Sequence, residues 1–386
     1  MRRPCVDEFP AGYGLALHQA AALNRKSSSS QILSERPVVF VQRSGTRLTL
    51  NGTTFFAAGY NCYFLSFCSD AIREATLRNA KKLGANTLRS WAFLDSLSQD
   101  SGSVTFQYLN GDFSEQNDGP DGLRRLDHLI TSAEALDLKL ILPLVNYWPD
   151  FGGMPAYLSW LGLPADDPAS FYRSARARNA FQVWIDHVLN RRNEISGRRY
   201  SEEPAVLAWE LANEPRCTGE GGRELLLDWI GEISDFVRQQ DSNHLLATGD
   251  EGFFCRRRRS HLYDGRYGVD FEAILGLDSI DLGTFHMYPQ HWGEWANQRF
   301  PQRWIRDHIQ AGAQAQKPVI LEEFGLSCEE QAGITDESRR TLYSEWINQM
   351  RDQGGAGALI WMLGNNSSET AGFRDKYTLD DAGESS

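Results

Sequence analysis

Short hydrophobic runs alternate with amphipathic segments along most of the chain. The runs carry β-branched and aromatic residues, which is typical of buried parallel strands. They predict strands over residues 55–60, 86–91, 140–145, 206–214, 245–248, 279–286, 319–323 and 358–361. The segments between them predict helices over residues 70–83, 121–138, 169–193, 224–240, 295–314 and 337–353. This alternation predicts an α/β fold, the (β/α)8 TIM barrel.

The two ends of the chain depart from this alternation. Residues 1–36 show no clear period and include a serine run, so they are expected to be a flexible leader. Residues 37–386 are expected to form one domain that begins with a hairpin over 38–50 closing the bottom of the barrel. No amphipathic run follows Trp361, so the final barrel helix is expected to be missing, atypical or replaced by the leader.

The composition of the chain limits the classes of ligand and partner that the protein is expected to bind. The net charge of −12 argues against nucleic acid and anionic membranes, whereas uncharged polysaccharides are compatible with it. No segment has the apolar length of a membrane span, and the N-terminus lacks a convincing signal peptide. The six cysteines show no C-x-x-C spacing, which argues against a structural zinc site. We expect a monomer without metal or cofactor.

Polar and aromatic residues stand where the predicted strands end. Catalytic groups of such barrels lie at this edge, because the loops that follow the strands form the cleft. The strand ends carry Asn61, Arg89, Trp91, Asn146, Trp148, Asn213, Glu214, Asp250, Glu251, His286, Tyr288, Glu323 and Trp361. Alone, His286 would more often be structural, Arg89 an ion-pair partner and Trp361 a core residue. Their coincidence favours a functional site.

Glu214 and Glu323 each stand at the end of an apolar strand, far apart in the sequence. Two glutamates in such positions suggest a two-carboxylate hydrolase. Pro215 is expected to end the strand and to bias Glu214 to an extended conformation. Glu210, four residues earlier, is expected to be a charge paired inside or below the barrel. Glu322 is expected to point to the opposite face of its strand and is rejected as catalytic.

Five motifs together resemble those of the endo-β-1,4-mannanases of glycoside hydrolase family 5, with the plant and fungal type as the nearest match. They span residues 88–93, 209–217, 284–289, 323–325 and 359–361. The resemblance covers the chain from about Pro37 to Trp361 and implies a retaining hydrolase. In such an enzyme Glu214 would be the acid/base and Glu323 the nucleophile, with carboxyl groups about 5 to 5.5 Å apart.

The same resemblance implies the remaining roles. Asn213 would bind the sugar 2-hydroxyl, and Arg89 and Tyr288 would position the nucleophile. His286 would support the acid/base, and Trp361 would floor the subsite beside the cleaved bond. The other substrate-binding residues would be Trp91, Asn146 and Trp148.

The family usually carries a signal peptide, so secretion is the expected fate although none is evident here. For an exported protein, a disulfide is expected between Cys217 and Cys255, which follow adjacent strands. Three alternatives stay open. A β-1,4-glucanase or a mannan transglycosylase would use the same two carboxylates, and a non-catalytic carbohydrate-binding barrel would share the fold.

Overall fold

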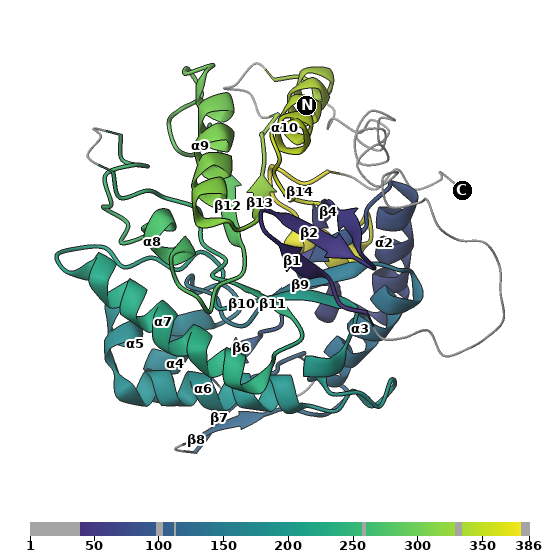
Figure 1. The fold of residues 1–386 in the computed structure, drawn as a ribbon. Coiled ribbons are helices and arrows are strands. Elements are labelled where there is room, and N and C mark those ends of the chain that lie inside the picture. The colour runs from purple at the N-terminus through teal and green to yellow at the C-terminus, as the bar shows by residue number, and fades with distance from the viewer. Residues whose placement is uncertain (1–38, 98–102, 112, 257–259, 329–333, 380–386) are drawn as a thin grey trace, which may run out of the picture.

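The computed structural model describes residues 39–97, 103–111, 113–256, 260–328 and 334–379. The expected leader over 1–36 lies outside the described residues. The described chain forms a barrel of strands ringed by helices (Figure 1). Within the described residues, no helix combines the length and apolar content that crossing a bilayer requires.

Eight strands form one parallel sheet, in the order β11-β10-β9-β5-β4-β14-β13-β12. Hydrogen bonds between Leu246 and Asp281, at 2.8 and 3.0 Å, bring the two ends of the sheet together. All eight predicted barrel strands are therefore confirmed. They are β4 (Ala57–Asn61), β5 (Thr87–Arg89), β9 (Lys139–Pro143), β10 (Val206–Glu210), β11 (Leu245–Ala247), β12 (Gly283–Met287), β13 (Val319–Phe324) and β14 (Gly357–Ile360).

Helices cover the outside of this sheet because each buries one apolar face. The predicted helix over 169–193 is wrong in one respect: it is divided at Ser174, whose extended backbone ends one helix and whose Oγ accepts a hydrogen bond from Ala177 N to begin the next. The α-helices are α2 (Asp70–Lys82), α3 (Arg124–Ala135), α4 (Gly153–Trp160), α5 (Ala169–Arg173), α6 (Ala175–Asn190), α7 (Gly222–Gln240), α8 (Phe271–Leu275), α9 (Phe300–Ala315) and α10 (Asp336–Asp352).

Two segments expected as loops contain regular structure. The loop after β5 holds a three-stranded sheet of β6 (Asp95–Ser96), β7 (Gln107–Asn110) and β8 (Phe113–Gln116). The Pro- and Gly-rich segment over residues 149–168 contains α4. Strands β6 and β8 consist mostly of polar residues, so they lack the apolar runs that marked the barrel strands.

The bottom of the barrel is closed as predicted. Strands β1 (Gln42–Ser44), β2 (Arg47–Leu50) and β3 (Thr53–Phe55) form an antiparallel sheet. Its buried side chains Val41, Leu48 and Phe55 share one apolar cluster with Ile141 and Leu207 of the barrel interior. This cluster fills the end opposite the predicted site.

The end of the chain also agrees with the sequence pattern. After β14, the described residues contain the 3-10 helix η3 (Ser368–Phe373) and no α-helix. Leu379 pairs with Leu363, and Tyr377 and Leu379 are buried. A short segment thus covers the last strand on this side.

Gly59 in β4 lies against the neighbouring strand. A Cβ at this position would lie 1.7 Å from the backbone oxygen of Thr87, whereas one at Gly231 in α7 would meet nothing within 4 Å. We expect Gly59→Ala to lower the free energy of unfolding by about 1–3 kcal/mol or more, because backbone must move. Gly231→Ala should raise it by about 0.5–1 kcal/mol. Urea unfolding of both variants tests this, and equal effects would contradict it.

Candidate active site

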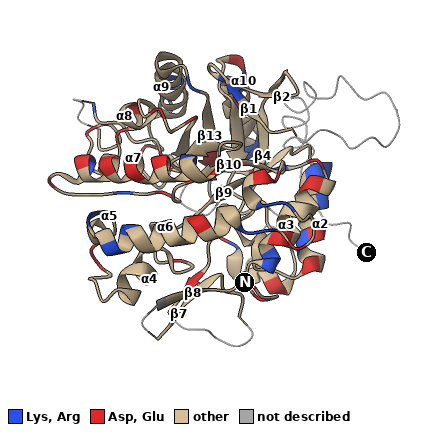
Figure 2. Cartoon of the chain, turned by 60° about the horizontal axis from the view of Figure 1, so that its bottom comes forward, with Lys and Arg blue, Asp and Glu red and all other residues tan. Residues whose placement is uncertain are grey.

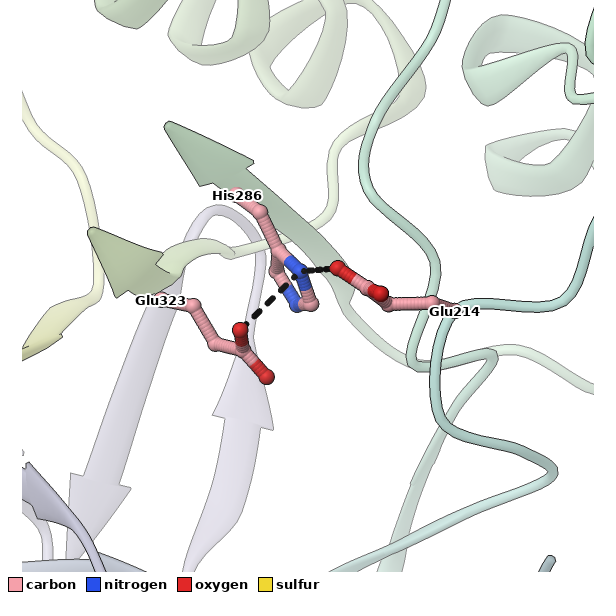
Figure 3. A group of neighbouring side chains, drawn as sticks. All are labelled: Glu214, His286 and Glu323. Atoms are coloured by element: carbon pink, nitrogen blue, oxygen red, sulfur yellow. Dashed lines mark hydrogen bonds and ion pairs between the residues drawn. The ribbon is translucent and has the colours of Figure 1, made fainter. Parts of the chain in front are cut away.

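Glu214, His286 and Glu323 converge at the carboxyl end of the barrel. His286 lies on β12, Glu323 near the end of β13, and Glu214 in the loop after β10 (Figure 3). His286 Nδ1 lies 2.8 Å from Glu214 Oε1 and 3.5 Å from Glu323 Oε2. One ligand atom from each side chain lies within 4.8 Å of the other two, so the group could also hold a metal ion.

Arg89 contacts Glu323 and two residues of β10 and its following loop. The side chain is fully buried at the end of β5. Its Nη1 donates to Glu323 Oε1 at 2.5 Å, its Nη2 to Asn213 Oδ1 at 2.8 Å, and its Nε to Glu210 Oε2 at 2.9 Å. Glu210 is fully buried and paired, which confirms the expectation for that residue. One guanidinium thus fixes three side chains from the ends of two strands, β10 and β13.

The prediction that Glu322 points away from the site is wrong. The register between β12 and β13 shifts where Phe285 pairs with Leu321 and His286 with Glu323, which leaves Glu322 as an extra residue. Such a bulge breaks the alternation of side chains. Glu322 and Glu323 both contact Arg89 and His286 as a result.

The backbone at Glu214 also differs from expectation. Strand β10 ends at Glu210, and Glu214 has a φ of +51°, the left-handed region instead of the extended one that Pro215 favours. Glu214 N donates to Gly249 O at 2.8 Å and Asn213 N to Val145 O at 2.8 Å. These hydrogen bonds to both neighbouring strands hold the unusual conformation, which occurs most often at functional positions.

Two residues at the end of β9 support Glu214 and Asn213. Trp148 Nε1 donates to Glu214 Oε2 at 2.6 Å. Asn146 Oδ1 accepts from Asn213 Nδ2 at 3.0 Å, and Asn146 Nδ2 donates to Asp150 O at 3.0 Å. The contacts therefore bring both predicted residues into the site, although each also serves to orient a neighbour.

Tyr288 donates its hydroxyl to Glu323 Oε2 at 2.7 Å. Together with Arg89 it contacts both oxygens of the Glu323 carboxylate. The pKa of Glu323 is nevertheless raised, because burial opposes ionisation more strongly than His286, Arg89 and Tyr288 favour it. Arg89 and Tyr288 therefore contact the carboxylate as expected, but burial outweighs their effect on its pKa.

Glu214 and His286 titrate together. Burial raises the pKa of Glu214, but the hydrogen bond and charge of His286 outweigh burial and lower it to about 2. Burial lowers the pKa of His286, but the charge of Glu323 and the bond with Glu214 raise it well above its ordinary value. These directions favour a protonated His286 beside an ionised Glu214 in the free protein.

The predicted aromatic residues form one stacked group. Tyr63 stacks on Trp361 at 5.7 Å between ring centroids and on Trp91 at 5.7 Å. Trp361 is half-buried and donates Nε1 to Asp375 Oδ2 at 2.7 Å. Trp91 is only 3% exposed, so it packs against the ring of Tyr63 in the interior. Its contact with substrate stays a prediction.

Sequence reasoning did not single out Tyr63 and Arg216. Arg216 donates to both oxygens of Glu251, at 2.5 and 2.6 Å, and its Cζ lies 5.1 Å from the centroid of the Trp148 ring. Its charge also lowers the pKa of Glu214. The sequence feature that could have identified Arg216 is its position two residues after Glu214, at the same strand end. Nothing in the pattern marked Tyr63, which lies in the 3-10 helix η1 (Tyr63–Ser66) after β4.

The expected disulfide between Cys217 and Cys255 is absent, because both thiols are free. The loops are adjacent as predicted, since Cys217 N donates to Tyr267 O at 2.9 Å and Cys255 pairs with Asp264. The two side chains differ in environment, however, because Cys217 is buried and Cys255 is exposed.

Replacing Arg89 by methionine is expected to lower the free energy of unfolding by about 3–5 kcal/mol, because buried carboxylates lose their cation. Glu210, Glu322 and Glu323 all contact this guanidinium. Guanidinium chloride unfolding at neutral pH measures the change.

The matched control is Arg78→Ala. Arg78 lies 3.3 Å from Glu74 on the surface, where a pair contributes about 0–1 kcal/mol. A loss at Arg89 no greater than at Arg78 would contradict the assigned role of the buried cation.

Comparisons with known proteins show the family to which the chain belongs. A family profile described as GH family 5 beta-mannosidase-like matches residues 38–362. Mannan endo-1,4-beta-mannosidase A of Podospora anserina is 39% identical over 341 residues, which cover 87% of this chain and 85% of that protein. The probable mannan endo-1,4-beta-mannosidase A of Aspergillus niger is 36% identical over 344 residues, 87% of this chain and 83% of that one.

A solved structure shares the fold at similar identity. The endo-1,4-beta-mannanase of Rhizomucor miehei superposes with a TM-score of 0.80 at 37% identity, covering 90% of this chain and 95% of that one. The endo-1,4-beta-D-mannanase of Thermotoga petrophila gives a TM-score of 0.74 at 33% identity, with 84% and 95% covered. The chain therefore belongs to the β-mannosidase-like group of glycoside hydrolase family 5.

Proposed function

We propose that this protein is a retaining endo-β-1,4-mannanase that uses Glu323 as nucleophile and Glu214 as acid/base. The observation that carries the mechanism is the approach of the two carboxylates. One oxygen of Glu214 and one of Glu323 lie within 4.8 Å of each other. This is close to the separation of about 5–5.5 Å used for direct attack, and it is shorter than the roughly 6.5–9.5 Å that an inverting enzyme needs for a water.

In the first step a Glu323 oxygen attacks the anomeric carbon while the glycosidic C–O bond breaks. The leaving oxygen takes its proton from Glu214 and departs as a free hydroxyl. In the second step water gives a proton to Glu214 and attacks the same carbon, which releases Glu323 as a carboxylate. Two inversions at one carbon return the original configuration.

The proton for the first step comes from His286. A sugar bound over Glu214 displaces water, and desolvation favours the neutral carboxyl group. The proton then moves from Nδ1 to Glu214 Oε1 along the 2.8 Å hydrogen bond. Because the nucleophile must be ionised and its pKa is raised, activity is expected to fall on the acid side as Glu323 becomes protonated.

The names of the relatives support β-1,4-mannan as the polymer. A neutral glycan also suits the surface, where acidic and basic residues are mixed along α2 and α3 and acidic residues recur along α7 (Figure 2). Asn213, held by Arg89 and Asn146, would meet the sugar 2-hydroxyl. Trp361 N donates to Phe324 O at 3.0 Å, next to Glu323, and the half-buried ring of Trp361 would offer a face to the sugar. Secretion and a monomeric state are part of this proposal.

The test compares linear β-1,4-mannan with carboxymethyl cellulose. Wild-type protein is expected to release reducing ends from mannan, to lower its viscosity early, and to give β-configured ends by proton NMR. Loss of viscosity with cellulose alone would make the protein a glucanase. Longer oligosaccharides formed from mannohexaose would indicate transglycosylation. Retention on mannan with no new reducing ends, in a folded protein, would indicate binding without catalysis.

A further inference from the structure

Two buried glutamates without a part in the proposed reaction lie behind the catalytic pair. Glu210 ends β10 and Glu322 is the bulge residue of β13, and both are fully buried. Arg89 Nε lies 2.9 Å from Glu210 Oε2 and 3.5 Å from Glu322 Oε2, while Nη1 reaches Glu323. Two carboxyl groups therefore hold one side of the guanidinium that positions the nucleophile on its other side.

Glu322 also faces the imidazole of His286. Its Oε2 lies 3.5 Å from Nε2, whereas Nδ1 of the same ring lies 2.8 Å from Glu214. Both ring nitrogens thus face carboxylates, so the imidazolium, a donor at both nitrogens, satisfies the contacts. When Nδ1 gives its proton to Glu214, the other proton stays on Nε2 towards Glu322. This contact determines which nitrogen releases the proton.

The remaining oxygen of each carboxyl group is the observation that indicates a shared proton. Glu210 Oε1 and Glu322 Oε1 are buried, and within the described part of the chain neither has a hydrogen-bond donor. The other oxygens, Glu210 Oε2 and Glu322 Oε2, lie 2.9 and 3.5 Å from the same atom, Arg89 Nε, so the two carboxyl groups are neighbours. Two carboxylates offer only acceptors, whereas one proton between them makes a hydrogen bond. Leaving both oxygens unpaired in the interior would be costly.

We propose that Glu210 and Glu322 share one proton, with Glu210 as the carboxylic acid and Glu322 as the carboxylate, and that this pair positions Arg89 and His286 behind the catalytic glutamates. Its contribution to catalysis rests on the proposed function. The shared proton does not depend on the proposed function.

The titration of the two groups supports this assignment. Burial raises the pKa of Glu210 well above its ordinary value. Burial also acts to raise the pKa of Glu322, but the charge of Arg89 and the hydrogen bond with Glu210 outweigh it and lower the pKa to about 2. Opposite directions in two neighbouring carboxyl groups are the behaviour of a pair that holds one proton.

A matched set of variants tests the positioning role. Glu322→Gln removes the negative charge beside His286, so the pKa of His286 falls. We expect the basic limb of the pH profile of kcat/KM on mannan to move down by about one pH unit. We also expect kcat to fall about 10- to 100-fold with little change in KM.

Glu210→Gln keeps a donor towards Glu322, whereas Glu210→Leu does not. The amide variant is therefore expected to keep the basic limb in place and to lose less kcat than the leucine variant. Burial raises the pKa of Asp250 to about 7, and the charge of Glu322 adds to this, so the profiles are repeated with Asp250→Asn. An unmoved basic limb in Glu322→Gln would overturn the positioning role.

Infrared spectroscopy tests the proton without any substrate. The wild-type protein at neutral pH is expected to show the carbonyl stretch of a buried carboxylic acid, and the difference spectrum against Glu210→Gln should contain this band. Its absence from that difference spectrum would overturn the pair, even if Glu322→Gln did not fold. A folded protein that shows the band but hydrolyses no mannan would overturn the proposed function and leave the shared proton supported.

Discussion

Glu323→Ala is expected to reduce the release of reducing ends from linear β-1,4-mannan by about 10⁴- to 10⁶-fold, because no covalent intermediate can form without the nucleophile. Arg89 and Tyr288 would remain aimed at the vacant position, since neither depends on Glu323 for its other contacts with the barrel. Binding of mannohexaose should persist. Initial rates and calorimetric binding measure the two quantities separately.

The matched control is Glu345→Ala, which removes an exposed glutamate from α10. Both variants should keep the circular dichroism spectrum of the wild type. Azide offers a sharper test on an aryl β-mannobioside. A single displacement by azide in Glu323→Ala should give the α-glycosyl azide. Loss of less than about tenfold in rate would contradict the nucleophile assignment.

Glu214→Ala is expected to slow mannan hydrolysis by about 10²- to 10⁴-fold, because the leaving oxygen would depart without a proton. The loss should be much smaller on an aryl β-mannobioside whose phenolate leaves readily. The basic limb of the pH profile should disappear, since the proton held between His286 and Glu214 would no longer reach the substrate. Rates on both substrates over a range of pH measure these effects.

The azide product separates the two carboxylates. Glu214→Ala retains Glu323, so azide would enter at the second displacement and give the β-glycosyl azide. If Glu214→Ala gave the α-azide and Glu323→Ala the β-azide, the two roles would be exchanged. The azide products are needed because, before substrate binds, the pKa of Glu214 is lowered and that of Glu323 is raised. These directions are the reverse of those expected for a proton donor and an ionised nucleophile.

The order of strands and helices was readable from the chain. Buried strands of a parallel sheet are apolar on both faces, and the covering helices repeat apolar positions at helical spacing, so each element carries its own signal. Polar residues at the strand ends, such as Glu214 and His286, marked the site because the barrel gathers these ends at one edge. Strands β6 and β8, whose residues are mostly polar, carried no such signal.

The sequence by itself determined the barrel, the edge that bears the site and the chemical groups available there. Only the tertiary structure decided which of these groups touch. Alternation along a strand placed Glu322 outside, but the bulge in β13 turned it inward to Arg89 and His286. Proline favoured an extended Glu214, but hydrogen bonds to adjacent strands hold it at positive φ. Local propensity covers neighbours in the chain, whereas contacts between strands and buried charges depend on the whole fold.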